Sequence, residues 1–186
     1  TKYFGARDLI KKMTGRFQEV VKDIKTRTEV KLSTVEWVTL ASIIEKETGA
    51  PDERPLVASV IFNRLKKKMR LQMDTTTIYG MWRKTGVPVK NISKADLLEK
   101  NEYNTYMISG LPAGPIGNPG RESLMAAIHP ADSKYLYFVS HNDGTHAFSE
   151  SLTDHNKSVV KFQVDRKARQ GKSWRDRTNK KAKDRR

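Results

Sequence analysis

The sequence predicts an α+β domain that is mostly helical and contains a small antiparallel sheet. Two observations carry this prediction. Apolar residues recur at helical spacing in several segments, and one short segment, residues 135–140, concentrates the aromatic and β-branched residues typical of a strand. The 186 residues include no cysteine, which excludes a disulfide scaffold, a thiol nucleophile and a cysteine-ligated metal site.

Helical segments account for most of the chain. In the first of them Leu9, Met13 and Phe17 share one face of the helix. Gly49 is expected to end the second, and Ser93 offers the side-chain oxygen that caps a later one. The predicted helices are residues 6–25, 34–48, 57–65, 93–100, 121–128 and a last helix that begins at Thr153 or Asp154.

Three other segments are not assigned to helices. Residues 71–81 are short and rich in threonine. Residues 109–120 contain 4 glycines and 3 prolines, a composition that excludes a helix or a central strand and predicts an ordered loop. The strand at 135–140 is followed by a turn signal at 142–144, so residues 146–148 are expected to pair back on it as a hairpin.

The formal net charge of +15 is unevenly distributed. Residues 161–186 carry 12 Lys and Arg against 3 Asp and Glu, whereas residues 1–160 carry 24 against 18. We therefore expect a domain over residues 1–160, and a basic helix end with a flexible tail over residues 161–186, where few apolar residues repay the entropy of ordering. Such a tail can bind a polyanion, but no nucleic-acid recognition motif accompanies it.

Several function classes lack their signatures. The sequence contains no P-loop, no GxGxxG fingerprint, no GxSxG elbow and no metal-binding spacing among its four histidines. No apolar run approaches the roughly 20 residues that span a bilayer. Because the chain begins at Thr1 without a signal peptide, we expect a fragment whose leader or anchor lies upstream.

Glu47 is the leading candidate for acid–base chemistry. It follows Ile44, Ile43 and Leu40 by three, four and seven residues, so it shares their apolar face near the end of a helix. Partial desolvation there would raise the pKa of its carboxyl group and suit it to donate a proton near neutral pH. Glu45 lies on a different side of the same helix. A solvated surface role is the alternative for both residues.

The segment from Gln72 to Tyr79 concentrates an amide, a carboxylate, hydroxyls and a phenol. Such groups bind sugar hydroxyls, although turn and cap chemistry is their commoner use. Asp74 is a second carboxylate or a helix cap, and the cap is the favoured interpretation. For His146 a structural or surface role is favoured over a place in a cleft.

Long ordered motifs over roughly residues 30–160 resemble one family. They are ASIIEKETGAPDERPLVASVIFNRLKKKMRLQMDTTTIYGM, YNTYMISGLPAGPIGNPGRESLMAAIHPADSKYLYFVS and HAFSESLTDHNKSV. On these motifs the chain resembles the YceG-like endolytic murein transglycosylases, the MltG family. The resemblance implies a lysozyme-like catalytic domain that cleaves peptidoglycan glycan strands internally, between N-acetylmuramic acid and N-acetylglucosamine. The product carries a 1,6-anhydromuramic end.

The resemblance also suggests site residues. The family's catalytic glutamate corresponds to Glu47, which would act first as the acid and then as the base. The pair Glu47-Thr48 resembles the Glu-Ser signature of lysozyme-like transglycosylases. No metal or other cofactor is expected. The candidates for binding substrate, each with a structural alternative, are Thr48, Gln72, Tyr79, Asn104 and Asn118.

The expected partners are peptidoglycan glycan strands and proteins of wall synthesis and elongation, and no nucleic acid is expected. The resemblance implies a full-length protein anchored in the bacterial inner (cytoplasmic) membrane, with the catalytic domain on the periplasmic or outer face. Two alternatives stay open. A hydrolytic muramidase would use the same glutamate with a water molecule, and a non-catalytic basic module would bind cell-wall polymer or nucleic acid.

Overall fold

The computed structural model describes residues 5–89 and 92–165, and the chain forms two compact units that divide after Ser33. The first unit holds α1 (Ala6–Arg27), which confirms the helix predicted over residues 6–25. Its apolar side chains Leu9, Ile10 and Met13 are exposed. The predicted tail lies outside the described residues from 166 onwards.

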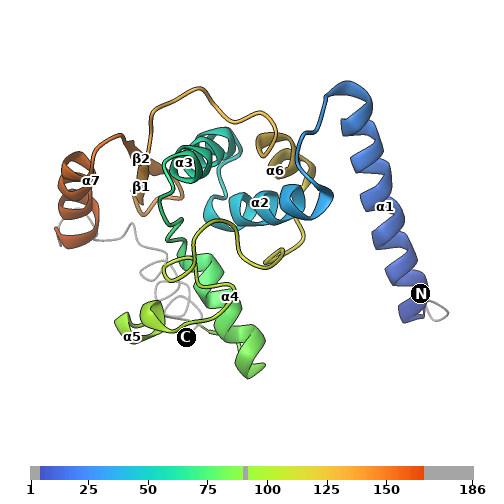
Figure 1. The fold of residues 1–186 in the computed structure, drawn as a ribbon, viewed down its shortest axis with the longest axis horizontal. Coiled ribbons are helices and arrows are strands. Elements are labelled where there is room, and N and C mark those ends of the chain that lie inside the picture. Colours follow the sequence, from blue (N-terminus) through green and yellow to red (C-terminus); the bar gives the residue numbers. More distant parts are fainter. Residues whose placement is uncertain (1–4, 90–91, 166–186) are drawn as a thin grey trace, which may run out of the picture. The chain divides into compact units, whose positions relative to one another are not determined.

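The second unit is α+β and mostly helical, which confirms the predicted fold class (Figure 1). Its helices α2, α3 and α6 contact one another and form the centre of the unit, the β-hairpin contacts α3 and α7, and α4 contacts α2. Its elements are α2 (Thr34–Glu47), η1 (Pro51–Glu53), α3 (Arg54–Lys66), α4 (Asp74–Thr85), α5 (Lys94–Leu98), α6 (Arg121–Ala126), β1 (Tyr137–Ser140), β2 (His146–Ser149), α7 (Leu152–Val159) and the π-helical turn η2 (Val160–Val164).

The core lies where α2, α3 and α6 meet. Trp37 on α2 is completely buried, and its indole Nε1 donates a hydrogen bond of 2.8 Å to the carbonyl oxygen of Leu124 on α6. Burial of so large an aromatic side chain with its polar atom satisfied contributes strongly to stability. The other large side chains buried in this core include Leu40, Ile43, Ile44, Val57, Val60 and Ile61.

The predicted hairpin is confirmed. Strands β1 and β2 pair antiparallel, with Phe138 opposite Phe148. In the connecting turn, Asn142 and Gly144 adopt positive φ angles of 66° and 101°, which asparagine and glycine tolerate best. Asn63 on α3 holds the segment before β1, because its side-chain Nδ2 donates to two backbone carbonyl oxygens there.

Helix α4 is the largest departure from the sequence prediction, which assigned no helix to residues 71–81. Threonine is a weak helix former, but tertiary contacts outweigh that preference here. Thr76 and Thr77 are completely buried, and their hydroxyls form hydrogen bonds with the Met73 carbonyl oxygen and the Asn104 side chain, respectively. The helix ends at Gly86, whose φ of 69° allows the left-handed C-cap.

The cap of α7 also differs from the prediction. Ser151 is the N-cap, rather than Thr153 or Asp154, because its hydroxyl accepts a hydrogen bond of 3.1 Å from the backbone N–H of Asp154. The cap predicted at Ser93 is confirmed and forms a capping box with Asp96.

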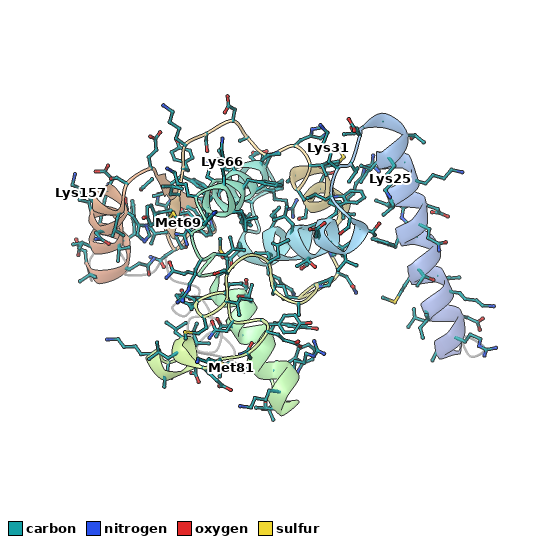
Figure 2. All side chains as sticks on the ribbon, viewed as in Figure 1. Lys25, Lys31, Lys66, Met69, Met81 and Lys157 are labelled. Carbon is teal, nitrogen blue, oxygen red and sulfur yellow. The ribbon has the colours of Figure 1, made fainter. Side chains whose placement is uncertain are left out.

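Basic side chains lie on the described surface of two helices. Lys66 at the end of α3 and Lys157 on α7 are exposed (Figure 2). Among the residues that the structure describes, no helix is long and apolar enough to span a membrane.

Candidate active site

The end of α2 holds two carboxylates in different surroundings, and the first is Glu45. Its Oε2 accepts hydrogen bonds from the Ser123 hydroxyl at 2.6 Å and the Gly120 backbone N–H at 3.0 Å, and Arg54 lies 3.9 Å from Oε1. Burial raises the pKa of Glu45, but these hydrogen bonds and charges outweigh it, so the pKa lies below its ordinary value. Ionised Glu45 therefore fastens the Gly- and Pro-rich loop to α2.

Glu47, two residues later, is half-buried, and its Oε1 accepts a hydrogen bond of 2.5 Å from the Thr75 hydroxyl on α4. Burial raises the pKa of Glu47 to about 7, the Thr75 hydrogen bond opposes that rise, and the charge of Asp74 adds to it. A large share of Glu47 side chains therefore carries a proton at neutral pH. Its position on the apolar stripe of α2 explains the desolvation.

Glu47 opens into a hollow of about 310 Å³, which we call the Glu47 cleft. The cleft lies among α2, α3, the start of α4, the hairpin and α7. Its polar lining includes Glu47, Arg64, Gln72, Asp74, Tyr106 and His155.

Arg64 supplies the fixed positive charge of the cleft. Its guanidinium donates to the carbonyl oxygens of Leu136 at 2.6 Å and Leu71 at 2.8 Å, and it stands 5.1 Å from the ring centre of Tyr137. Burial lowers the pKa of Arg64, but arginine stays charged in proteins. The cleft therefore combines one buried cation with two carboxyl groups.

Asp74 is one of these carboxyl groups, and its interpretation as a helix cap is wrong. Met73 occupies the N-cap position of α4, and no side chain caps that end. Instead, Asp74 Oδ1 accepts a hydrogen bond of 2.6 Å from the Tyr106 hydroxyl. Burial, followed by this hydrogen bond and the Asp74 charge, raises the pKa of Tyr106, so the phenol stays protonated as a donor.

The structure brings Gln72 into the same cleft as Glu47, and Gln72 adopts a left-handed φ of 51°. Thr48, in contrast, is buried. Its hydroxyl donates to Glu53 Oε2 at 3.0 Å and accepts from the Ala50 N–H at 3.0 Å. This arrangement gives Thr48 a structural role at the end of α2.

Glu53 also binds the hairpin. Its two carboxylate oxygens lie 2.7 Å from the backbone N–H and from Nδ1 of His146 on β2. The structural role favoured for His146 is therefore confirmed. The Glu53 carboxylate thus links Thr48, directly after Glu47 at the end of α2, to His146 on β2.

Asn104 is completely buried and has no exposed atom with which to contact a sugar. Its Nδ2 donates to the Glu99 carbonyl oxygen at 2.7 Å, and its Oδ1 accepts from the Thr77 hydroxyl and the Tyr106 N–H. Through the hydrogen bond from the Tyr106 backbone N–H, buried Asn104 thus helps to hold Tyr106 beside the cleft.

Tyr79 borders a second hollow of about 420 Å³, which we call the Trp82 pocket. Thr75 lies between the two hollows, because it lines the pocket while its hydroxyl donates a hydrogen bond to Glu47. Asn118 is exposed in the loop and lines neither hollow. The residues of the Trp82 pocket used below are Lys46, Thr75, Ile78, Tyr79, Trp82 and Ile116.

Within the described residues, no three His, Asp or Glu side chains gather as metal ligands would. The cleft therefore offers acid–base groups and hydrogen-bond donors around one half-buried carboxyl group.

Comparison with known proteins places this chain in a family. The model of the YceG-like family matches residues 2–161. The chain belongs to this family. An endolytic murein transglycosylase of Bacillus subtilis is 38% identical over 83% of this chain, and one of Streptococcus pneumoniae is 32% identical over 69% of it. The crystal structure of a YceG-like protein from Listeria monocytogenes has a TM-score of 0.62 at 37% identity over 82% of the chain.

This YceG-like chain spans less than half the length of these relatives. It covers 42% of the Bacillus subtilis protein, 24% of the Streptococcus pneumoniae protein and 45% of the Listeria monocytogenes chain.

Sequence reasoning did not propose Arg64 or His155, two polar residues of the cleft of this YceG-like domain, as site residues. Arg64 shares the apolar side of α3, which could have identified it as a buried, functional cation. His155 comes from α7, and its Nδ1 is buried with no hydrogen-bond partner among the described residues. No local pattern identifies His155, because its segment reaches the cleft only through the fold.

Proposed function

We propose that this domain is a lytic transglycosylase that cuts peptidoglycan glycan strands internally, between N-acetylmuramic acid and N-acetylglucosamine. The single observation that carries the proposal is the carboxyl group of Glu47, which has a pKa of about 7 and opens into a polar cleft. The relatives named endolytic murein transglycosylase support it.

The first step is protonation of the leaving glycosidic oxygen. Thr75 holds the Glu47 carboxyl group through a hydrogen bond to Oε1, and the protonated carboxyl group donates its proton to the substrate in the cleft. A general acid works best when its pKa lies near the working pH, and Glu47 meets that condition. The C–O bond then breaks, and positive charge develops at the anomeric carbon of the muramic acid.

Asp74 lines the same cleft, and its carboxyl group lies where it stabilises this positive charge. Tyr106 orients Asp74 through its hydroxyl. The N-acetyl group of the muramic acid is a second, internal source of stabilisation, as in substrate-assisted glycosidases.

The second step returns the proton. Glu47, now ionised, removes the proton from the sugar's own C6 hydroxyl, and that oxygen bonds to the anomeric carbon to form the 1,6-anhydro ring. No water is consumed, and Glu47 ends protonated as it began. Attack within one sugar ring gains from proximity, provided that the cleft holds the ring and excludes water.

The competing reaction is hydrolysis by a water molecule that Glu47 activates. Mass spectrometry of glycan strands digested by this chain separates the two outcomes, because an anhydro product is one water lighter than a hydrolysed one. We expect anhydro ends. Products that all carry the extra water would show that the domain is a muramidase instead of a transglycosylase. The Glu47→Gln variant should form neither anhydro nor hydrolysed products.

We place the catalytic domain within residues 1–160 of a membrane-anchored protein, on the outer face of the cytoplasmic membrane, where peptidoglycan lies. The net charge of +6 over residues 1–160 suits an anionic wall and membrane surface. Wall-synthesis proteins are the expected neighbours there. Removal of the basic tail, residues 161–186, should leave glycan cleavage intact.

A further inference from the structure

The Trp82 pocket differs in chemistry from the Glu47 cleft that it adjoins. Its walls are mainly apolar: Ile78 and Trp82 from α4 and Ile116 from the Gly- and Pro-rich loop. Trp82 is 47% exposed, an unusual state for a side chain with so much apolar surface. Tyr79 packs edge-on against Trp82 with 5.7 Å between ring centres, which fixes the aromatic wall.

One cation stands at the rim of the pocket. Lys46 is exposed and directly precedes Glu47 on α2. A side chain at Gly117 would begin 2.9 Å from the Lys46 Cε, so the glycine leaves room for the lysine to lie along the loop. The pocket therefore offers an apolar, aromatic wall and a positive charge.

The position of the pocket identifies its occupant. Thr75 separates it from the cleft by a single side chain, and that side chain is hydrogen-bonded to the Glu47 carboxyl group. A group bound in the pocket would therefore lie close to the sugar at the cleavage point. In peptidoglycan, muramic acid carries a lactyl ether that is linked to a short peptide.

We propose that the Trp82 pocket binds the lactyl-peptide arm of the muramic acid residue whose glycosidic bond lies at Glu47. This inference rests on the proposed function. The arm begins with two methyl-bearing units, the lactyl group and alanine, and continues with an acidic residue. The methyl groups match the wall formed by Ile78, Trp82 and Ile116, and the carboxylate matches Lys46. The enzyme thus prefers strands that still carry their peptides.

The test compares two substrates: glycan strands with intact peptides, and the same strands stripped of peptides by an amidase. We expect the chain to cleave the peptide-bearing strands with the higher kcat/KM. Trp82→Ala should lower that kcat/KM about tenfold and change cleavage of stripped strands by less than about twofold. Lys46→Gln should act in the same direction but less strongly, because its charge is exposed.

Matched controls exist for both substitutions. Leu98→Ala removes an exposed apolar side chain (70% exposed) that lines neither hollow, and Lys67→Gln removes an exposed lysine that lines neither hollow. Both should leave the ratio of the two kcat/KM values unchanged. An equal loss on both substrates in Trp82→Ala, or equal cleavage of both by the unsubstituted chain, would overturn the peptide site and leave the proposed function standing.

A binding measurement separates the two proposals further. N-acetylmuramyl-L-alanyl-D-isoglutamate should quench the fluorescence of Trp82 in the Glu47→Gln variant, and its peptide-free counterpart N-acetylmuramic acid should do so far more weakly. Quenching of the Glu47→Gln variant by the dipeptide, together with no cleavage of either substrate by the unsubstituted chain, would keep the peptide site and reject the transglycosylase. Equal responses to both probes would reject the peptide site.

Discussion

The two sides of α2 place carboxylates of the same type in opposite states. On one side, Glu45 is held by Ser123, Gly120 and Arg54, and its pKa lies below the ordinary value. On the other side, Glu47 faces the cleft with hydrogen bonds from Thr75 alone, which do not outweigh its burial, and its pKa is about 7. The difference teaches that partners, rather than residue type or position along the helix, decide which glutamate anchors structure and which can donate a proton.

The largest effect should come from Glu47→Gln. The amide keeps the volume of the side chain but cannot exchange a proton, so glycan cleavage should fall about a thousandfold. Binding of glycan strands and the far-ultraviolet circular dichroism spectrum should stay unchanged. The matched control is Glu45→Gln, which should retain cleavage per folded molecule within about threefold. A reversal of the two results would exchange the roles of the two residues.

The same Glu47→Gln substitution should stabilise the fold at alkaline pH. Folding raises the pKa of Glu47 from its unfolded value of 4.5 to about 7, so the native state binds more protons between these values and loses stability as pH rises. The variant does not lose this stability, because glutamine does not titrate. Its free energy of unfolding at pH 9 should exceed that of the unsubstituted chain by up to about 3 kcal/mol. Chemical denaturation at pH 4 and pH 9 measures the difference, which should vanish at pH 4.

Glu45→Gln should have the opposite effect on stability. Because folding depresses the pKa of Glu45, its ionised form stabilises the native state above the unfolded pKa, and that contribution is lost as pH falls through the folded pKa. Loss of the charged hydrogen bonds from Ser123 and Gly120 should cost about 1–2 kcal/mol at pH 7. If the Glu45→Gln variant were as stable as the unsubstituted chain, Glu45 would not anchor the loop and α6 to α2.

A smaller and more specific effect is expected from Asp74→Asn. Removing the negative charge of Asp74 lowers the pKa of Glu47. In the unsubstituted chain, kcat/KM should fall as pH rises through about 7, and in the variant this fall should begin at a lower pH. We expect the rate at neutral pH to fall about tenfold, since charge stabilisation is also lost. Asp52→Asn, an exposed carboxylate that lines neither hollow, should leave the pH profile unchanged.

The sequence predicted the fold class, the β-hairpin and the position of most helices, because these depend on local periodicity and turn residues. Helix α4 escaped prediction because Thr76 and Thr77 satisfy their hydroxyls through the fold rather than through the helix pattern. The position of Asp74 was misread for the same reason. With α4 unrecognised, nothing indicated that its first turn faces Glu47 and Tyr106.

For the site, the apolar stripe of α2 favoured Glu47 over Glu45 only modestly, and the family resemblance assigned the catalytic role to Glu47. The opposite state of Glu45 depends on Ser123, which lies 78 residues away along the chain. Contacts of that separation leave no local pattern. The same holds for His155, which enters the cleft from α7.

The most direct test of the central claim is a nuclear magnetic resonance titration of the glutamate side-chain carboxyl carbons, with assignments from Glu45→Gln and Glu47→Gln. We predict that Glu47 titrates with a midpoint of about 7, while Glu45 titrates below its ordinary value of 4.5. A Glu47 midpoint at or below 4.5 would mean that the carboxyl group is ionised throughout the neutral range. The account of Glu47 as the proton donor would then be contradicted.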